Sequence, residues 1–179
     1  PLIDTHEHPL EEKERLAGAG HPRVQADDWS LLLSHYLNSD LIVAGMPQDA
    51  YNQLFSAKTD PMDKWRLLEP YWLAVKNTGY GQAVRIAMRR LYDVDDLSGQ
   101  TVKQVQAGYE KVRRPGFYRH VLCEEGRIES CQVNCLSTAF GETEMPSLLM
   151  QDISIVGMFA GPNLNGYAGP AGIEVNSLT

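Results

Sequence analysis

The chain has 179 residues and a formal net charge of −7, from 16 lysines and arginines against 23 aspartates and glutamates. This length suits one domain or a piece of a larger one, and 43% hydrophobic with 22% charged residues indicates a globular chain with a packed core rather than a disordered or collagen-like one. The negative charge argues against nucleic acid as a partner, because binding phosphates needs a basic surface.

Membrane insertion and export are not expected either. No apolar run approaches the roughly 20 residues that span a bilayer, and the N-terminus lacks the basic region and apolar stretch of a signal peptide. Three cysteines cannot all pair within one chain, which favours free thiols in a reducing compartment, and so a cytoplasmic protein. The chain starts abruptly at Pro1, and residues 176–179 could cap a further helix. Both features lead us to expect a fragment of a longer polypeptide, although processing of the first residue would explain the start equally well.

The predicted elements begin with a strand at residues 2–5 and a loop over 9–26 that is broken by glycine and proline. Helical patterns then dominate. Caps, prolines and apolar residues at three- and four-residue spacing predict helices that start at Asp27 or Asp28, near Leu41, at Asp60-Pro61, at Gly81 and at Ser98. The last of these is stopped by Pro115-Gly116, and the helical block ends near Glu125.

Strand patterns return after the helical block. Alternating apolar residues predict a strand over 127–136, and a second apolar run predicts one over 153–158, so that Asp152 would open a strand. A glycine- and proline-rich loop over 161–172 follows. Strands separated by helical segments predict an α/β protein with parallel strands.

The first predicted strand runs directly into Asp4-Thr5-His6-Glu7-His8-Pro9. Residues two apart on a strand point to the same face, so His6 and His8 can present both imidazoles at its carboxyl end. Imidazole is a common metal ligand, and two on one strand favour binding of a divalent ion. Asp4 could accept the second N–H of a ligand histidine or support the strand end. An exposed polar pair that binds no metal is the alternative.

An apolar strand that ends in Asp-x-His-x-His resembles the first-strand signature of the amidohydrolase superfamily, the metal-dependent hydrolases built on a (β/α)8 barrel. Many of these enzymes pass directly from the first strand to the first helix, whereas this chain has a long helical segment there. In this respect it resembles the uronate isomerase branch. Four segments are similar to that branch in residue type and in their order along the chain: 34–37, 63–66, 71–72 and 89–92.

The resemblance implies an α/β fold that is the N-terminal part of a TIM barrel with a large helical insertion after the first strand. Residues 1–8 would form the first strand, 9–126 the insertion and 127–179 the second- and third-strand region, together one partial domain. A full barrel needs about 250 residues and eight strands. The resemblance also implies that His6 and His8 bind a divalent metal ion, zinc being the first choice, and that catalytic residues lie beyond Thr179.

Four residues of the insertion are candidates for substrate binding. His35 and Tyr36 resemble a place where the uronate isomerase branch brings polar groups toward its substrate, although a histidine in a helix is more often half-buried or on the surface. Arg89 and Arg90 could bind a substrate carboxylate through paired N–H groups. Solvated charges on the outer face of a helix are the alternative for both arginines.

The resemblance implies a metal-dependent hydrolase that acts on a small carboxylate- or amide-containing molecule through metal-activated water, or a decarboxylase of a small acid. The first alternative is a uronate isomerase-like sugar-acid isomerase, in which a base moves a proton between neighbouring carbons. From another class, a non-catalytic helical interaction module would suit a chain whose site is incomplete. The chain alone is expected to be inactive, and homo-oligomer formation is left open.

Overall fold

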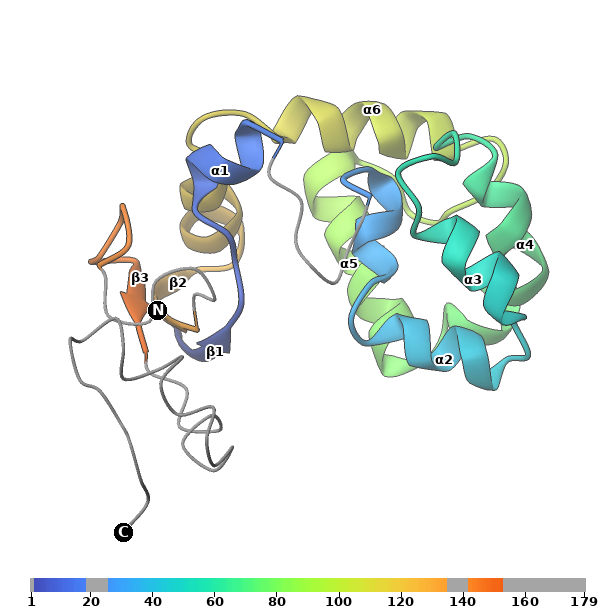
Figure 1. The fold of residues 1–179 in the computed structure, drawn as a ribbon, viewed down its shortest axis with the longest axis horizontal. Coiled ribbons are helices and arrows are strands. Elements are labelled where there is room, and N and C mark those ends of the chain that lie inside the picture. The colour runs from blue at the N-terminus through green and yellow to red at the C-terminus, as the bar shows by residue number, and fades with distance from the viewer. Residues whose placement is uncertain (1, 19–25, 135–141, 153–179) are drawn as a thin grey trace, which may run out of the picture. The chain divides into compact units, whose positions relative to one another are not determined.

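The computed structural model describes residues 2–18, 26–134 and 142–152. By its internal contacts the chain divides into two compact units, both drawn in Figure 1. The sheet unit consists of Pro1–Arg15 and Tyr118–Thr179, and the helical unit consists of Leu16–Phe117. In the sequence, the helical unit therefore lies between the two parts of the sheet unit.

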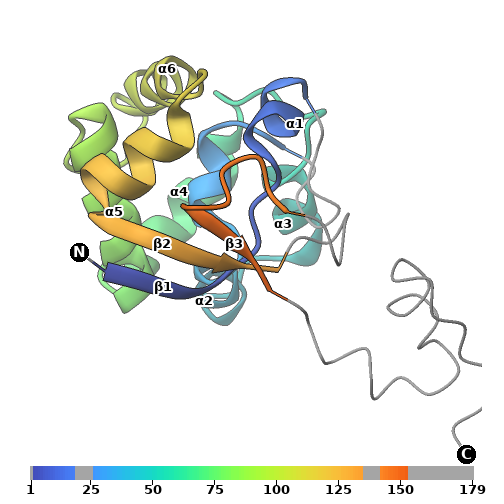
Figure 2. The same ribbon diagram turned by 90° about the vertical axis from the view of Figure 1, so that its left-hand side faces the viewer.

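The sheet unit contains three strands in its described part, β1 (Leu2–Glu7), β2 (Ile128–Val133) and β3 (Leu149–Gln151). They lie side by side in the order β1-β2-β3, and both pairings are parallel (Figure 2). The prediction of an α/β protein with parallel strands is confirmed. The described sheet is open and does not close into a barrel.

The strand predictions after the helical block are confirmed only in part. β2 lies within the predicted 127–136 segment, and its alternating Cys131 and Val133 are buried as expected. Residues 149–151 form a strand that was not predicted, so Asp152 follows a strand instead of opening one. The predicted strand at 153–158 and the loop at 161–172 lie outside the described residues.

Two short helices also belong to the sheet unit, α1 (Glu12–Leu16) for all but its last residue and the π-helix η2 (Arg119–Glu125), which packs on β2. The prediction of a loop throughout 9–26 is wrong at α1. This helix has no buried residue, so no apolar period marks it. A long-range contact holds it instead, because the Tyr118 N–H donates to Glu12 Oε1 at 2.7 Å.

The helical unit contains a 3-10 helix and five α-helices among its described residues. These are η1 (Trp29–Leu33), α2 (Leu37–Val43), α3 (Gln48–Leu54), α4 (Lys64–Val75), α5 (Gly79–Tyr92) and α6 (Val102–Val112). The predicted stripe of α4 is confirmed, since Trp65, Leu68, Trp72 and Val75 are all buried. Within the described ranges, no helix combines the length and the apolar character needed to cross a bilayer.

The helix starts show how side chains fix local structure. Asp28 accepts the Ser30 N–H at 2.9 Å and so caps η1, which confirms the predicted cap but gives a 3-10 helix in place of an α-helix. Asp60 caps a turn, and its carbonyl accepts the Lys64 N–H at 3.2 Å, so α4 begins later than predicted. Ser98 likewise opens the turn before α6, because its hydroxyl accepts the Thr101 N–H at 3.2 Å.

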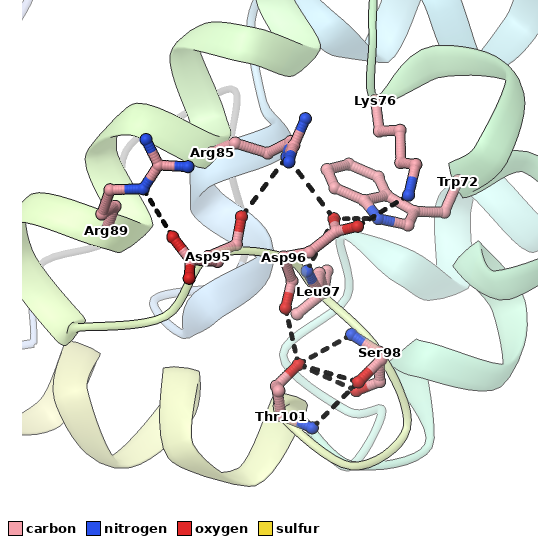
Figure 3. A network of polar contacts seen from close by, with 9 residues as sticks. All are labelled: Trp72, Lys76, Arg85, Arg89, Asp95, Asp96, Leu97, Ser98 and Thr101. Atoms are coloured by element: carbon pink, nitrogen blue, oxygen red, sulfur yellow. Dashed lines mark hydrogen bonds and ion pairs between the residues drawn. The ribbon is translucent and has the colours of Figure 1, made fainter.

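A polar network around Asp96 joins α4, α5 and the segment before α6 (Figure 3). One Asp96 carboxylate oxygen accepts from Trp72 Nε1 at 2.9 Å and the other from Lys76 Nζ at 2.6 Å, while Arg85 Nε lies 3.6 Å away. Partial burial would raise the pKa of Asp96. The hydrogen bonds from Lys76 and Trp72 and the charges of Lys76 and Arg85 outweigh it and lower the pKa below 3.8.

Asp96→Asn should therefore lower the free energy of unfolding at neutral pH. It should also make this free energy less dependent on pH in the acidic range. Because the pKa is lowered on folding, ionised Asp96 stabilises the fold above pH 3.8. This contribution is lost as the pH falls through the lower pKa of the folded state. Urea unfolding should show a larger deficit for the variant at neutral pH than at about pH 3. Glu69→Gln, an exposed change on α4, is the control, and an equal deficit for Asp96→Asn at both pH values would contradict the account.

Candidate metal site

The structure brings the imidazoles of His6 and His8 together at the carboxyl end of β1. Their ring centroids lie 4.6 Å apart and the ring planes meet at 89°. His6 is exposed and His8 is half-buried. The pair therefore presents two nitrogen donors on one side of a strand end, at a position that solvent reaches.

His8 also has a backbone partner on the neighbouring strand. Its Nδ1 lies 3.4 Å from the carbonyl oxygen of Asn134, the residue that follows β2. A proton on Nδ1 would face this carbonyl, and Nε2 would keep its lone pair for an ion. Ligand histidines commonly use a backbone carbonyl in this way, because it fixes the tautomer and the ring orientation.

Asp4 supports the strand end rather than an imidazole. Its Oδ1 accepts the backbone N–H of His6 at 3.1 Å. Of the two roles expected for Asp4, this contact matches the support of the strand. It fixes the main chain at the first histidine, which reduces the freedom of the ring that follows from it.

The register between strands assigns the side chains to two faces. Asp4 and Glu7 are level with Cys131 and Val133, with a bulge between the two β1 residues, and Val133 is level with Gln151. We call this side, which also carries Leu149, the apolar face. The residues that alternate with these along each strand point to the other side of the sheet. This histidine face includes Ile3, His6, His8, Gln132, Met150 and the buried Ser130, which is level with Ile3.

The two faces differ in exposure and in electrostatics. Ile3 and Met150 of the histidine face are 67% and 46% exposed, whereas Cys131 of the apolar face is fully buried. Burial raises the pKa of the Cys131 thiol to about 11, with further effects of the Asp4 and Glu7 charges. The thiol therefore stays protonated at neutral pH and behaves as a small apolar side chain.

Glu7 lies between the two histidines in the sequence but on the opposite face. Partial burial of its carboxyl group and the adjacent Asp4 carboxylate raise the pKa of Glu7, and a hydrogen bond from the His8 backbone and the His6 charge act in the other direction. Two close carboxyl groups disfavour each other's ionisation. The acidic side chains nearest to the histidine pair in the sequence therefore interact with each other, on the apolar face.

The donor set of the pair suits a borderline divalent ion such as zinc, which takes imidazole nitrogen readily. Catalytic zinc sites use three protein ligands and leave one position open. Among residues 2–18, 26–134 and 142–152, no three His, Cys, Asp or Glu side chains stand together as a set that could hold an ion. As the side chains lie, His6 and His8 supply two ligands.

Sequence reasoning misplaced one polar residue at this edge of the sheet. Asp152 follows β3, and its N–H donates to the Val133 carbonyl at 2.9 Å, which extends the β2–β3 ladder by one residue. It is half-buried. The signal was weak, because a three-residue strand is too short for alternation to stand out from its surroundings.

The candidate substrate residues His35 and Tyr36 lie in the helical unit, between η1 and α2. His35 has a φ of 71°, and the Tyr36 N–H donates to the Ser34 carbonyl at 2.9 Å, the arrangement of a strained γ-turn. The helix predicted to start at Asp27 or Asp28 therefore ends before His35, which does not lie in a helix. Tyr36 stacks on Tyr80 of α5 with centroids 5.0 Å apart, and His35 meets Tyr36 edge-on at 4.4 Å.

Arg89 and Arg90 also belong to the helical unit, on the exposed side of α5. Arg89 Nε donates to Asp95 Oδ1 at 2.6 Å (Figure 3). An acidic side chain of the chain itself therefore occupies part of the guanidinium that was expected to hold a substrate carboxylate. Asp95, whose side chain is 81% exposed, was not singled out from the sequence.

Comparison of the chain with models of known protein families, with curated proteins and with solved structures finds no match. The case for a function therefore rests on the chemistry of the site itself.

Proposed function

We propose that the protein is a metal-dependent hydrolase of the amidohydrolase type, in which His6 and His8 bind a divalent ion, zinc being the first choice. Its substrate would be a small molecule with a carboxylate or an amide group. The observation that carries the proposal is the geometry of the pair. Two imidazoles lie 4.6 Å apart at the carboxyl end of a parallel strand, and the Nδ1 of one faces a backbone carbonyl.

The strand arrangement supports a barrel as the larger architecture. A (β/α)8 barrel needs parallel strands in sequential order, with catalytic groups at their carboxyl ends. The order β1-β2-β3, the parallel pairings and the position of the histidines agree with this requirement. In such a barrel the histidine face would line the interior.

The chain's own residues would have separate roles. The Asn134 carbonyl orients the His8 ring, and Asp4 fixes the backbone at His6. A bound ion would supply activated water and polarise the scissile carbonyl.

A sugar-acid isomerase is the second candidate, because His35 and Tyr36 resemble a place where the uronate isomerase branch brings polar groups toward its substrate. A non-glycine residue at positive φ stores strain, and such strain often marks functional sites. Here it holds His35 against Tyr36, which is 55% exposed. The two candidates differ in mass balance. A hydrolase adds water and releases a new acid or amine, whereas an isomerase converts an aldehyde sugar acid to its ketone without a change in mass.

A reducing, cytoplasmic setting is proposed with either activity. Cys123 and Cys131 are free thiols, and free thiols persist where the thiol pool is kept reduced.

Zinc affinity of the purified chain tests the proposal. Competition with a chromogenic chelator should give about one tight site per chain in wild type. His6→Ala and His8→Ala should each weaken it by at least about tenfold, because each removes a ligand. His120→Ala is the matched control, since His120 is a half-buried histidine of the same unit on η2, away from the strand end. Equal affinity in all four proteins, or no zinc binding by folded wild type, would overturn the proposal.

A further inference from the structure

We propose that Asp152 is a third protein ligand of the ion held by His6 and His8. This inference rests on the proposed function and extends it, because it completes the ligand set from residues of this chain alone. The proposed site would then consist of two imidazoles from β1 and one carboxylate from the end of β3.

The register of the sheet places Asp152 at the same edge as the histidines. Asn134 N–H donates to the Glu7 carbonyl at 2.8 Å, and Asp152 N–H donates to the Val133 carbonyl at 2.9 Å. These bonds continue both ladders by one residue past the paired positions Glu7, Val133 and Gln151. His8 and Asp152 therefore follow level residues at the carboxyl ends of β1 and β3.

Alternation places the Asp152 side chain on the histidine face. Glu7 and Gln151 share the apolar face, so the residue after each of them is directed to the other side. The two carboxylates of β1, those of Asp4 and Glu7, belong to the apolar face. Among the described carboxylates at this edge, Asp152 is the one that shares a face with His6 and His8.

Hydrogen bonds hold the backbone of Asp152 but not its carboxylate. Its N–H pairs with Val133, and its carbonyl accepts from Gln151 Nε2 at 2.8 Å. Its carboxylate has no hydrogen-bond or ion-pair partner among residues 2–18, 26–134 and 142–152. A carboxylate without another partner in the described part of the chain is a suitable anionic ligand, because zinc binds Asp and Glu oxygens as well as imidazole nitrogen.

The spacing of the strands permits ligation across the middle strand. β1 and β3 are two strand spacings apart, roughly 9.6 Å, so an ion above β2 lies between the two sets of side chains. As they lie, the three groups do not converge on one point, and binding requires rotation of the Asp152 side chain. Two histidines and one carboxylate form an established ligand set for catalytic zinc, with a fourth position open for water.

The test compares Asp152→Asn with wild type in zinc affinity and in the visible spectrum of the cobalt(II) form. Asparagine keeps the size of the side chain but removes its charge. Zinc affinity should fall by at least about tenfold, and the cobalt absorption should change because an oxygen ligand is replaced. A residue that only supports the fold would leave the cobalt bands of the bound ion unaltered. Asp152→Glu, which keeps a carboxylate, should retain binding within a few-fold.

Glu129→Gln is the matched control, because Glu129 is an exposed carboxylate on β2, away from the carboxyl edge. If the histidine variants lose zinc while Asp152→Asn keeps wild-type affinity and spectrum, Asp152 is not a ligand and the histidine site stands. Equal loss in Asp152→Asn and Asp152→Glu, with altered far-ultraviolet circular dichroism in both, also overturns the role as ligand. If folded wild type binds no zinc through His6 and His8, the proposed function and this inference both fail.

Discussion

Lys64→Ala should lower the free energy of unfolding by about 3–5 kcal/mol, because it leaves a buried carboxylate without its partner. Lys64 is fully buried at the start of α4, and its Nζ lies 2.6 Å from Asp28 Oδ2 and 3.2 Å from Ser30 Oγ. Asp28 is 7% exposed. The fluorescence of the three tryptophans, all in the helical unit, should report this loss as an earlier transition in urea.

Two further variants separate the buried pair from surface pairs. Arg66→Ala removes the exposed ion pair with Asp63, whose atoms lie 3.0 Å apart, and should change the free energy of unfolding by less than about 1 kcal/mol. The double variant Asp28→Asn with Lys64→Met keeps a capping oxygen for Ser30 and removes both charges. It should recover most of the loss. A deficit for Lys64→Ala no larger than that of Arg66→Ala would contradict the account.

Gly81→Ala should destabilise the protein, although alanine is normally the better helix former. A Cβ at Gly81 would clash with the Val75 carbonyl oxygen and lie 2.7 Å from the Lys76 backbone. These are main-chain atoms at the junction of α4 and α5, so the clash cannot be relieved by a side-chain rotation. The expected cost is about 1–3 kcal/mol or more, measured by urea unfolding.

Gly79→Ala in the same helix is the matched control. Gly79 is the first residue of α5, and a Cβ added there would meet no described atom within 4 Å. Alanine at this position should raise the free energy of unfolding by up to about 1 kcal/mol, since it reduces the freedom of the unfolded chain. Opposite signs at the two glycines are the expected result. A neutral or stabilising Gly81→Ala would show that the two helices do not meet as closely as described.

The parts of the fold with a strong apolar period were predictable from the sequence. The stripe Trp65, Leu68 and Trp72 marks α4 because all three are buried on one side. Other elements have no such mark. α3 buries only Leu54, and α1 buries no residue, so their sequences show no helical period. Such helices depend on tertiary contacts, which no local pattern reveals.

The candidate site was predictable to the same limited extent. The spacing of His6 and His8 gave a shared face because strands repeat every two residues. The Asn134 carbonyl near His8 is separated from it by 126 positions, and a backbone carbonyl has no residue-type signature. Asp152 was placed at the wrong end of a strand. Its position depends on the pairing of β3 with β2, which the sequence of a three-residue strand does not specify.

X-ray absorption at the zinc edge of the zinc-loaded protein tests the central claim most directly. Imidazole scattering from two histidines, with nitrogen and oxygen neighbours at about 2.0–2.2 Å, is the predicted result. The imidazole contribution should disappear in the His6→Ala, His8→Ala double variant. Sulfur neighbours at about 2.3 Å, or an imidazole signal that persists in the double variant, would show that zinc binds elsewhere and would contradict the account.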